Sequence, residues 1–152
     1  MLPKIHIILG LIFSAILFFF FPNLGWLGFS ITFLSSVLID IDHYIYYIFR
    51  KGNFNFFKAY NYFFETMQKG KNMPKKERKK YFYGFFIMHG IEFIIFLLLL
   101  SNLSHYFAYI AIGAGFHLVL DIIFSVIFIG RIDRLSIIYD YIKFKNSYYL
   151  KK

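Results

Sequence analysis

The stretch 106–129, with the sequence YFAYIAIGAGFHLVLDIIFSVIFI, is apolar almost throughout. A helix that crosses the ~30 Å hydrocarbon core of a bilayer needs about 20 such residues, so this stretch predicts a transmembrane helix. Apart from its tyrosines, its only ionisable side chains are His117 and Asp121. An ionised carboxylate at the bilayer centre costs at least ~2.5–3.5 kcal/mol, and such residues are functional by default. The stretch therefore predicts both a membrane fold and a site within it.

Three further apolar stretches predict three more transmembrane helices, at about 5–21, 24–49 and 81–103. The outer connections at 22–25 and 101–105 are short turns, so consecutive helices are expected to pack as antiparallel neighbours. We therefore expect an all-α fold, a four-helix transmembrane bundle that forms a single integral membrane domain over residues 1–152. The composition agrees, since 59% of the residues are hydrophobic and 24% are aromatic.

Basic residues are concentrated in three regions of a chain whose net charge is +9. Ten of the 17 Lys and Arg residues lie in the loop 50–80, six lie in the tail 130–152, and the last is Lys4. Because basic residues mark the cytoplasmic side of membrane proteins, we expect the loop and both termini of this multi-pass protein in the cytoplasm. Beside membrane helices, such regions typically meet anionic headgroups, so we expect membrane lipids as partners and no nucleic acid.

The basic cytoplasmic loop 50–80 also carries an apolar stripe. Its members recur at helical spacing and are Phe56, Phe57, Tyr60, Phe63, Phe64 and Met67. This pattern predicts an amphipathic interfacial helix, which either lies in the headgroup region or packs its stripe onto the bundle. The basic tail 130–152 contains a second candidate surface helix, through Leu135, Ile138 and Ile142.

Seven His and acidic residues interrupt the predicted helices in three groups. They are Asp40, Asp42 and His43 in the second helix, His89 and Glu92 in the third, and His117 and Asp121 in the fourth. Residues three or four apart share a helix face, as do His89 with Glu92 and His117 with Asp121. At ~1.5 Å rise per residue, each group lies roughly 10–18 Å from the cytoplasmic end of its helix. We therefore expect all three groups to meet in one layer.

Carboxylates and imidazoles that project inward from several helices are typical of metal sites in bundle cores. The chain has no cysteine, so this donor set suits zinc, and also manganese or iron. Several carboxylates favour more than one ion, and we expect one to three. Asp42 is expected either to bind a second ion or to orient a histidine, and Glu92 or Asp42 is the candidate general base. The alternatives are a buried polar network without metal and a proton or ion pathway.

The same residues resemble the YdjM-like membrane-bound metal-dependent hydrolases of bacteria and archaea. Three motifs carry the resemblance: His6-Ile7-Ile8-Leu9-Gly10, Asp40-Ile41-Asp42-His43, and a Gly-x-x-x-His-x-x-x-Asp pattern that runs from Gly113 to Asp121. The resemblance covers most of the chain between the first and the last of these. It departs at 84–90, where the family's His-Arg-x-x-Thr-His-Ser segment retains only His89, and at Ile39, where the family has proline.

That family is similar to the zinc-dependent phospholipase C and P1 nuclease superfamily, whose all-helical fold binds clustered zinc ions. The resemblance implies a phosphoesterase-like hydrolase whose metal ligands are His6, Asp40, Asp42, His43, His89, His117 and Asp121. Either Glu92 replaces a missing ligand or fewer ions are bound, and the residue pattern alone leaves His6 open. The expected function is hydrolysis of a lipid or lipid-linked phosphate near the cytoplasmic leaflet. The alternatives are a non-enzymatic metal-binding or metal-transporting membrane protein and a scaffold whose polar groups only fix helix packing.

Overall fold

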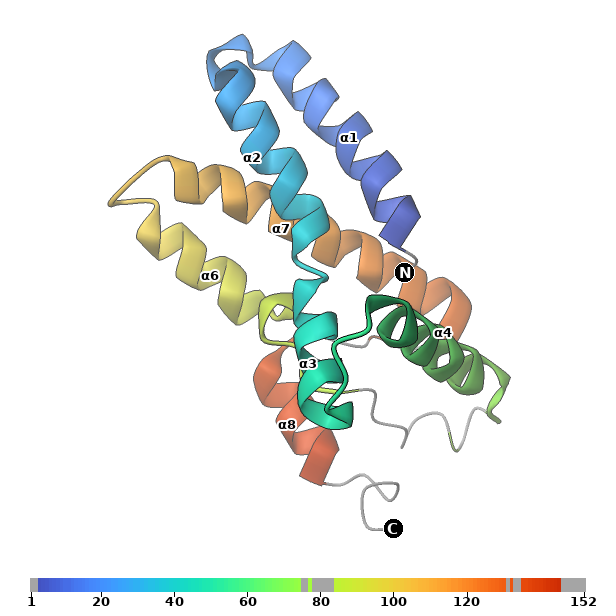
Figure 1. Ribbon diagram of the computed structural model, residues 1–152. Helices are drawn as coiled ribbons and strands as arrows, with labels where there is room; N and C mark the ends of the chain where they lie inside the picture. Colours follow the sequence, from blue (N-terminus) through green and yellow to red (C-terminus); the bar gives the residue numbers. More distant parts are fainter. Residues whose placement is uncertain (1–2, 75–76, 78–83, 131, 133–134, 146–152) are drawn as a thin grey trace.

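The structure is a computed structural model that describes residues 3–74, 77, 84–130, 132 and 135–145. Within these ranges every regular element is helical. The first hairpin consists of α1 (Pro3–Phe20), the short turn η1 (Pro22–Leu24) and α2 (Gly25–Leu38), which α3 (Ile41–Lys51) continues. The second consists of α6 (Ile91–Leu100) and α7 (Tyr106–Phe124), followed by the π-helical turn η3 (Ser125–Ile129). The two hairpins cross, and α7 packs against α1, α2 and α6 (Figure 1).

Three helical segments are long and apolar enough to cross a membrane, namely Pro3–Phe20, Pro22–Lys51 and Tyr106–Phe128. Their surfaces are apolar, with Ile8 and Ile12 of α1 at 59% and 50% exposure, whereas Thr32 of α2 and His117 of α7 are fully buried. Charged and polar residues of a water-soluble protein have the opposite distribution. The all-helical fold therefore has the surface of a membrane protein, as the sequence predicted.

Two of the predicted helices differ from those in the structure. The second, at 24–49, is divided by a break at Ile39 and Asp40, where the backbone N–H of Asp40 bonds the carbonyl of Val37. The third, at 81–103, begins at residues 81–83, which lie outside the described residues; of the rest, residues 84–86 are not helical, η2 (Ile87–His89) is a single turn, and α6 has only ten residues. Gly84 with φ of +150° and the extended Gly90 explain its late start, because helical backbone allows neither conformation.

Small and polar residues at a spacing of four form the contacts between α1, α2 and α7. The buried residues are His6, Gly10 and Ser14 on α1, and Gly28, Thr32 and Ser36 on α2. A Cβ at Gly10 would collide with Ser36 Oγ, and one at Gly113 of α7 would collide with the carbonyl oxygen of Thr32. Small residues let membrane helices approach this closely. The close packing places the polar side chains of the three helices next to one another.

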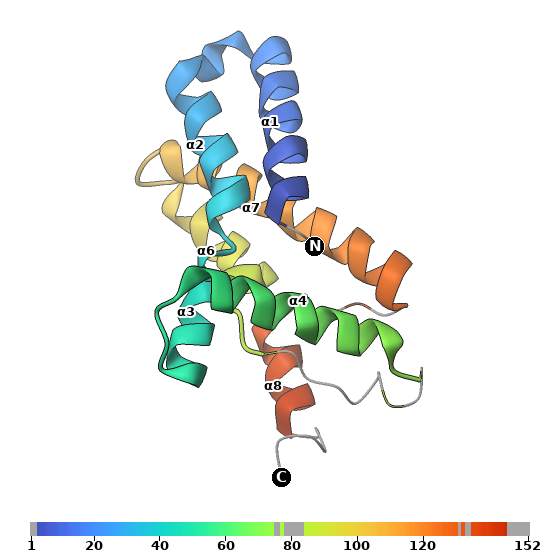
Figure 2. The same cartoon turned by 45° about the vertical axis from the view of Figure 1, so that its right-hand side comes forward.

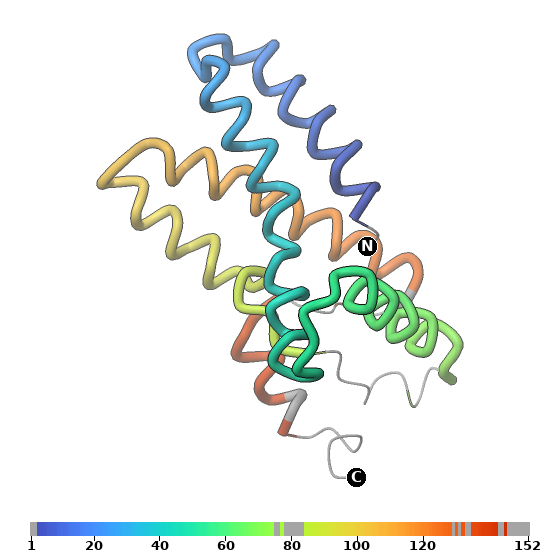
Figure 3. The backbone as a smooth tube through the Cα atoms, in the orientation of Figure 1, coloured from blue at the N-terminus to red at the C-terminus, as the bar shows by residue number. Residues whose placement is uncertain are grey.

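The helices α4 (Phe56–Asn72) and α8 (Ile137–Lys145) lie at the end of the molecule opposite η1 (Figure 2). The predicted amphipathic helix in the basic loop corresponds to α4, whose Ala59 is buried while Phe56 and Phe57 are exposed. The predicted tail helix corresponds to α8. Figure 3 shows that α3 continues the path of α2 after the break and then turns back into α4.

Candidate metal centre

Four segments that are distant in the sequence bring His and Asp side chains to one region. His6 comes from α1, Asp40 from the break between α2 and α3, His89 from η2, and His117 and Asp121 from α7. The imidazoles of His6, His89 and His117 are the largest fully buried side chains in the described part of the chain. Buried polar groups need partners, so the contacts of these rings indicate what the site can bind.

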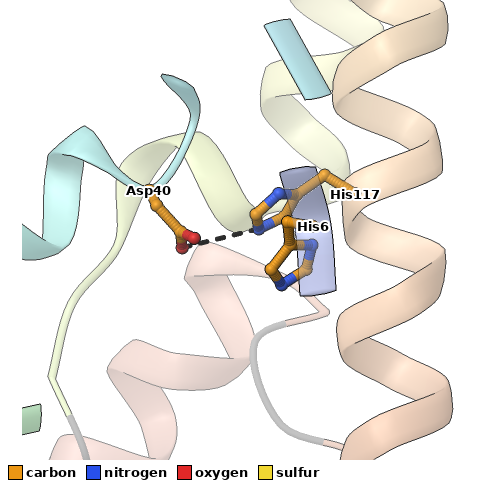
Figure 4. Close-up of side chains that lie close together, drawn as sticks. All are labelled: His6, Asp40 and His117. Atoms are coloured by element: carbon orange, nitrogen blue, oxygen red, sulfur yellow. Dashed lines mark ion pairs between the residues drawn. The ribbon is translucent and has the colours of Figure 1, made fainter. Parts of the chain in front are cut away.

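Three overlapping groups of donors could hold a metal ion. They are His6, Asp40 and His117; Asp40, His43 and His89; and His89, His117 and Asp121. Within each group, one donor atom from every residue lies within 4.8 Å of the others. Figure 4 shows the first group, in which the Asp40 carboxylate points at the His117 ring and His6 lies beside that ring.

The hydrogen bonds of His89 and His117 fix which nitrogen of each neutral ring carries the proton. Nδ1 of His117 lies 2.8 Å from the carbonyl oxygen of Ser36, and Nδ1 of His89 lies 3.0 Å from Asp42 Oδ2. Both partners only accept, so each Nδ1 donates and each Nε2 presents a lone pair. The two Nε2 atoms face each other at 3.1 Å. Two facing lone pairs repel, and either a proton or a metal ion between them removes the repulsion.

The spacing of the donor atoms suits a metal ion. Four ligands at 2.0–2.1 Å from a tetrahedral ion lie about 3.3 Å from one another. Asp40 Oδ1 lies 3.4 Å from His89 Nε2 and 3.6 Å from His117 Nε2. Asp121 Oδ2 lies 3.8 Å from each of the same two nitrogens. Each of the two carboxylates thus lies at nearly the required separation from both imidazole nitrogens.

The break between α2 and α3 prepares two parts of this site. In a continuous helix the N–H of Asp40 would bond the carbonyl of Ser36, four residues earlier. It bonds Val37 instead, at 3.4 Å, which leaves the Ser36 carbonyl to accept from His117 Nδ1. The same break carries Asp40 to the two Nε2 atoms. An irregular backbone at this depth is tolerated in membrane proteins where it is buried in protein.

Asp42 contacts Nδ1 of both His43 and His89, and on the His89 ring this is the nitrogen that does not face His117. Its Oδ1 lies 2.9 Å from His43 Nδ1, and its Oδ2 accepts from His89 Nδ1 and from the backbone N–H of Met88 at 3.1 Å. Asp42 belongs to none of the three donor groups. A carboxylate that holds the far nitrogen of a ligating histidine fixes the ring orientation and raises its basicity. Of the two roles expected for Asp42, its position fits the orientation of a histidine.

His43 lies next to the His89 ring and His6 lies next to the His117 ring, so they flank the pair formed by His89 and His117. His43 stacks on Phe86 with ring centroids 4.0 Å apart and lies edge to face with Phe63 of α4 at 5.1 Å. His6 stacks on His117 at 3.8 Å, and its Nε2 lies 3.2 Å from Asp121 Oδ1. That contact lacks hydrogen-bond geometry, so both ring nitrogens of His6 are buried without a hydrogen-bond partner among the described residues. Such an imidazole fits a site that takes up a ligand.

Glu92 lies in the first turn of α6 and contacts a different element. Its carboxylate accepts hydrogen bonds from Ser136 Oγ and from the backbone N–H of Ile137, where α8 begins. Both of its oxygens are therefore engaged by the start of α8 rather than by the histidines. Glu92 belongs to none of the three donor groups, and its position is that of a cap for α8.

Several contributors to the site were missed in the sequence. The Ser36 carbonyl, the Met88 N–H and the ring of Phe86 carry no pattern of their own. The one available signal was the spacing of four shared by His6, Gly10 and Ser14, which marks the packed face of α1.

The chain matches no protein-family model, no curated protein and no solved structure. The function is therefore inferred from the geometry of the site itself.

Proposed function

We propose that this protein is a membrane-bound metal-dependent hydrolase that acts on a phosphoester of a lipid or lipid-linked compound near the cytoplasmic leaflet. The observation that carries the proposal is the pair of Nε2 atoms of His89 and His117, 3.1 Å apart and flanked by Asp40 and Asp121. Imidazole and carboxylate donors without thiolate suit zinc best, with manganese and iron as the other choices. The same donor types are those that the resemblance to the YdjM-like hydrolases implies.

The chain's own residues divide the work of such a site. A divalent ion supplies Lewis-acid activation of a phosphoryl oxygen and of water. Asp40 and Asp121 balance its charge, and Asp42 holds His89 in orientation. Asp40 has the most exposed carboxylate of the three, at 24% compared with 10% for Asp42 and 5% for Asp121. Substrate therefore approaches from the side of Asp40 and His43, where a carboxylate oxygen can also accept a proton.

The three donor groups share residues, which limits how many ions can bind at once. Asp40, His89 and His117 each belong to two of the groups. A neutral imidazole nitrogen binds a single ion, so an ion held by His89 and His117 would leave Asp40 with His43, or Asp40 with His6, to hold a second one. We propose one ion at His89 and His117, with a second beside His43 or His6.

We further propose that the protein crosses the membrane four times with both termini in the cytoplasm. Three crossings correspond to the long apolar segments, and α6 together with the residues that precede it makes the fourth. The support for this topology is the basic loop 50–80 and the basic tail 130–152, which an even number of crossings places on one side.

Non-enzymatic metal binding is the second candidate, and the near-complete burial of three imidazoles favours it. Transport is less well supported, because a transporter needs access to the site from both faces. Ser14 of α1 and Thr32 of α2, which lie on the packed faces between the centre and the η1 end, are fully buried, which argues against access from that side.

The test is metal content of the detergent-purified protein by plasma mass spectrometry, followed by hydrolysis assays with phospholipid and soluble phosphoester substrates. A His117→Ala/Asp121→Ala variant should lose both metal and activity. The matched control is His105→Ala, because His105 is the one histidine of the chain outside the cluster and is exposed. Metal without hydrolysis would favour the second candidate, and no metal after reconstitution with each ion would refute both.

A further inference from the structure

The corner between α3 and α4 exposes four phenylalanine rings. Phe49, Phe54, Phe56 and Phe57 are 86%, 75%, 62% and 77% exposed. Large exposed apolar patches mark interaction sites, and these four rings lie within nine residues of one another in the sequence. The corner follows directly on the membrane-spanning segment that ends at Lys51. Its apolar surface is therefore continuous with the surface that faces lipid.

The position of the corner along the spanning segment matches a membrane interface. A second set of exposed aromatic rings, which includes Phe19, Phe20 and Trp26, lies at the η1 end. From there, α2 and α3 extend over residues 25–51, which at ~1.5 Å per residue is roughly 40 Å. A bilayer is about 40–45 Å thick with its headgroup regions included. The two aromatic sets thus have the separation of the aromatic belts at the two surfaces of a membrane.

The charged residues around the corner indicate which class of lipid headgroup it would contact. Arg50, Lys51 and Lys58 are exposed beside the four rings, and no acidic residue lies between Phe49 and Phe64. Basic side chains close to a membrane surface are attracted to its anionic headgroups. A zwitterionic surface lacks this attraction.

The corner is also held rigid, so the exposure of the rings is built into the fold. Gly52 ends α3 with φ of +61°, and the Tyr44 hydroxyl donates to the carbonyl of Phe54. The Asn53 side chain accepts from the N–H of Asn55 at 2.8 Å, and the Asn55 side chain caps α4 by accepting from Lys58 N–H at 3.0 Å. Ordering these residues before binding lowers the entropic cost of inserting the rings.

Two turns further along its apolar stripe, α4 reaches the candidate metal centre. Phe63 lies against His43 at 5.1 Å and against Phe86 at 6.1 Å. Because α4 begins at the exposed corner and contacts the candidate ligand His43 through Phe63, insertion of the corner into headgroups would fix the depth of the centre relative to the lipid.

We propose that the corner formed by Phe49, Phe54, Phe56 and Phe57 inserts into the headgroup region of an anionic leaflet, with Arg50, Lys51 and Lys58 on its phosphates. Through Phe63, α4 then holds the side of the site that carries Asp40 and His43 at the level of the headgroups. The lipid contact does not depend on hydrolysis, and only the placement of the entrance rests on the proposed function.

Tryptophan fluorescence of the full-length protein in vesicles tests this contact. The chain has one tryptophan, so a Trp26→Phe background with Phe57→Trp reports on the corner alone. In vesicles of phosphatidylcholine and phosphatidylglycerol, brominated acyl chains should quench the emission of the introduced indole roughly two-fold. The soluble quencher acrylamide should have little effect, and the unmodified protein with Trp26 serves as the control for an interfacial tryptophan.

The role of charge is tested with Arg50→Gln/Lys51→Gln/Lys58→Gln in the same background. Its bromine quenching should fall to the level that the unchanged corner shows in pure phosphatidylcholine. Strong acrylamide quenching with no bromine quenching would refute the proposal. Protection from both quenchers that increases with protein density would also refute it, because a second copy of the chain would then cover the corner. Neither outcome depends on metal content or activity, so failure here is distinguishable from failure of the hydrolase proposal.

Discussion

Among single residues, Asp42 shows how one carboxylate serves two histidines. Because both of its oxygens accept from His43, His89 or Met88, an amide at this position would turn a donor toward one imidazole. We expect Asp42→Asn to lower metal affinity about 10–100-fold, as loss of such an orienting partner does. Competition with a chromogenic chelator measures the affinity. The control is Glu65→Gln, on the exposed surface of α4, and equal affinity in Asp42→Asn and wild type would exclude the orienting role.

Two glycines of α7 make a matched pair for testing helix contact. A Cβ at Gly113 would collide with the Thr32 carbonyl and with Ser35 Oγ, whereas one at Gly115 would find only Ile94 at 3.9 Å. Gly113→Ala should therefore lower the free energy of unfolding by about 1–3 kcal/mol through forced separation of α2 and α7. Gly115→Ala should leave it equal or slightly raised, since alanine favours the helix. Thermal unfolding in detergent by circular dichroism compares them, and equal losses would contradict the close contact.

Among the elements, the first turn of α6 and the start of α8 are joined through Glu92. If Glu92 caps α8, Glu92→Ala should cost about 0.5–2 kcal/mol and increase hydrogen exchange over residues 137–145. It should retain full metal content, because Glu92 lies outside the donor groups. Protein mass spectrometry measures the hydrogen exchange, and plasma mass spectrometry measures the metal content. Metal loss as complete as in the His117→Ala/Asp121→Ala variant would instead make Glu92 a ligand.

The helical elements were predictable to different degrees. The helix of 106–129 was anticipated within one turn because its apolar length decides it. The break at Ile39 and Asp40 was not, because no Pro or Gly marks it and the contact from His117 to Ser36 that accompanies it is distant in sequence. The late start of α6 had a visible signal in Gly84 and Gly90, which apolar periodicity outweighed. The approach of the His and Asp side chains was predictable from their depth along the helices. The expectation that Glu92 would join them rested only on its spacing of three from His89, and its carboxylate contacts the start of α8 instead.

For the whole molecule, the donor groups connect α1, the α2–α3 break, η2 and α7, so a bound ion should stabilise the complete fold. An ion at 100 times its dissociation constant adds about 2.7 kcal/mol. Removing metal with EDTA should therefore lower the Tm of the wild type and of His105→Ala by the same amount. The His117→Ala/Asp121→Ala variant should not respond, and a wild-type Tm indifferent to EDTA and to added zinc would argue against a structural ion. Differential scanning fluorimetry in detergent provides the measurement.

The stacking of His6 on His117 also constrains the biogenesis of the protein. His6 leaves the ribosome first, yet its partner ring belongs to the last spanning helix. Until α7 has been synthesised, the polar face of α1 that carries His6 lacks its contact with the His117 ring. The centre can form only when α7 is present, so an ion held there would be taken up after this helix has been made. A chain truncated before α7 would present an unsatisfied N-terminal helix to the cell's quality control.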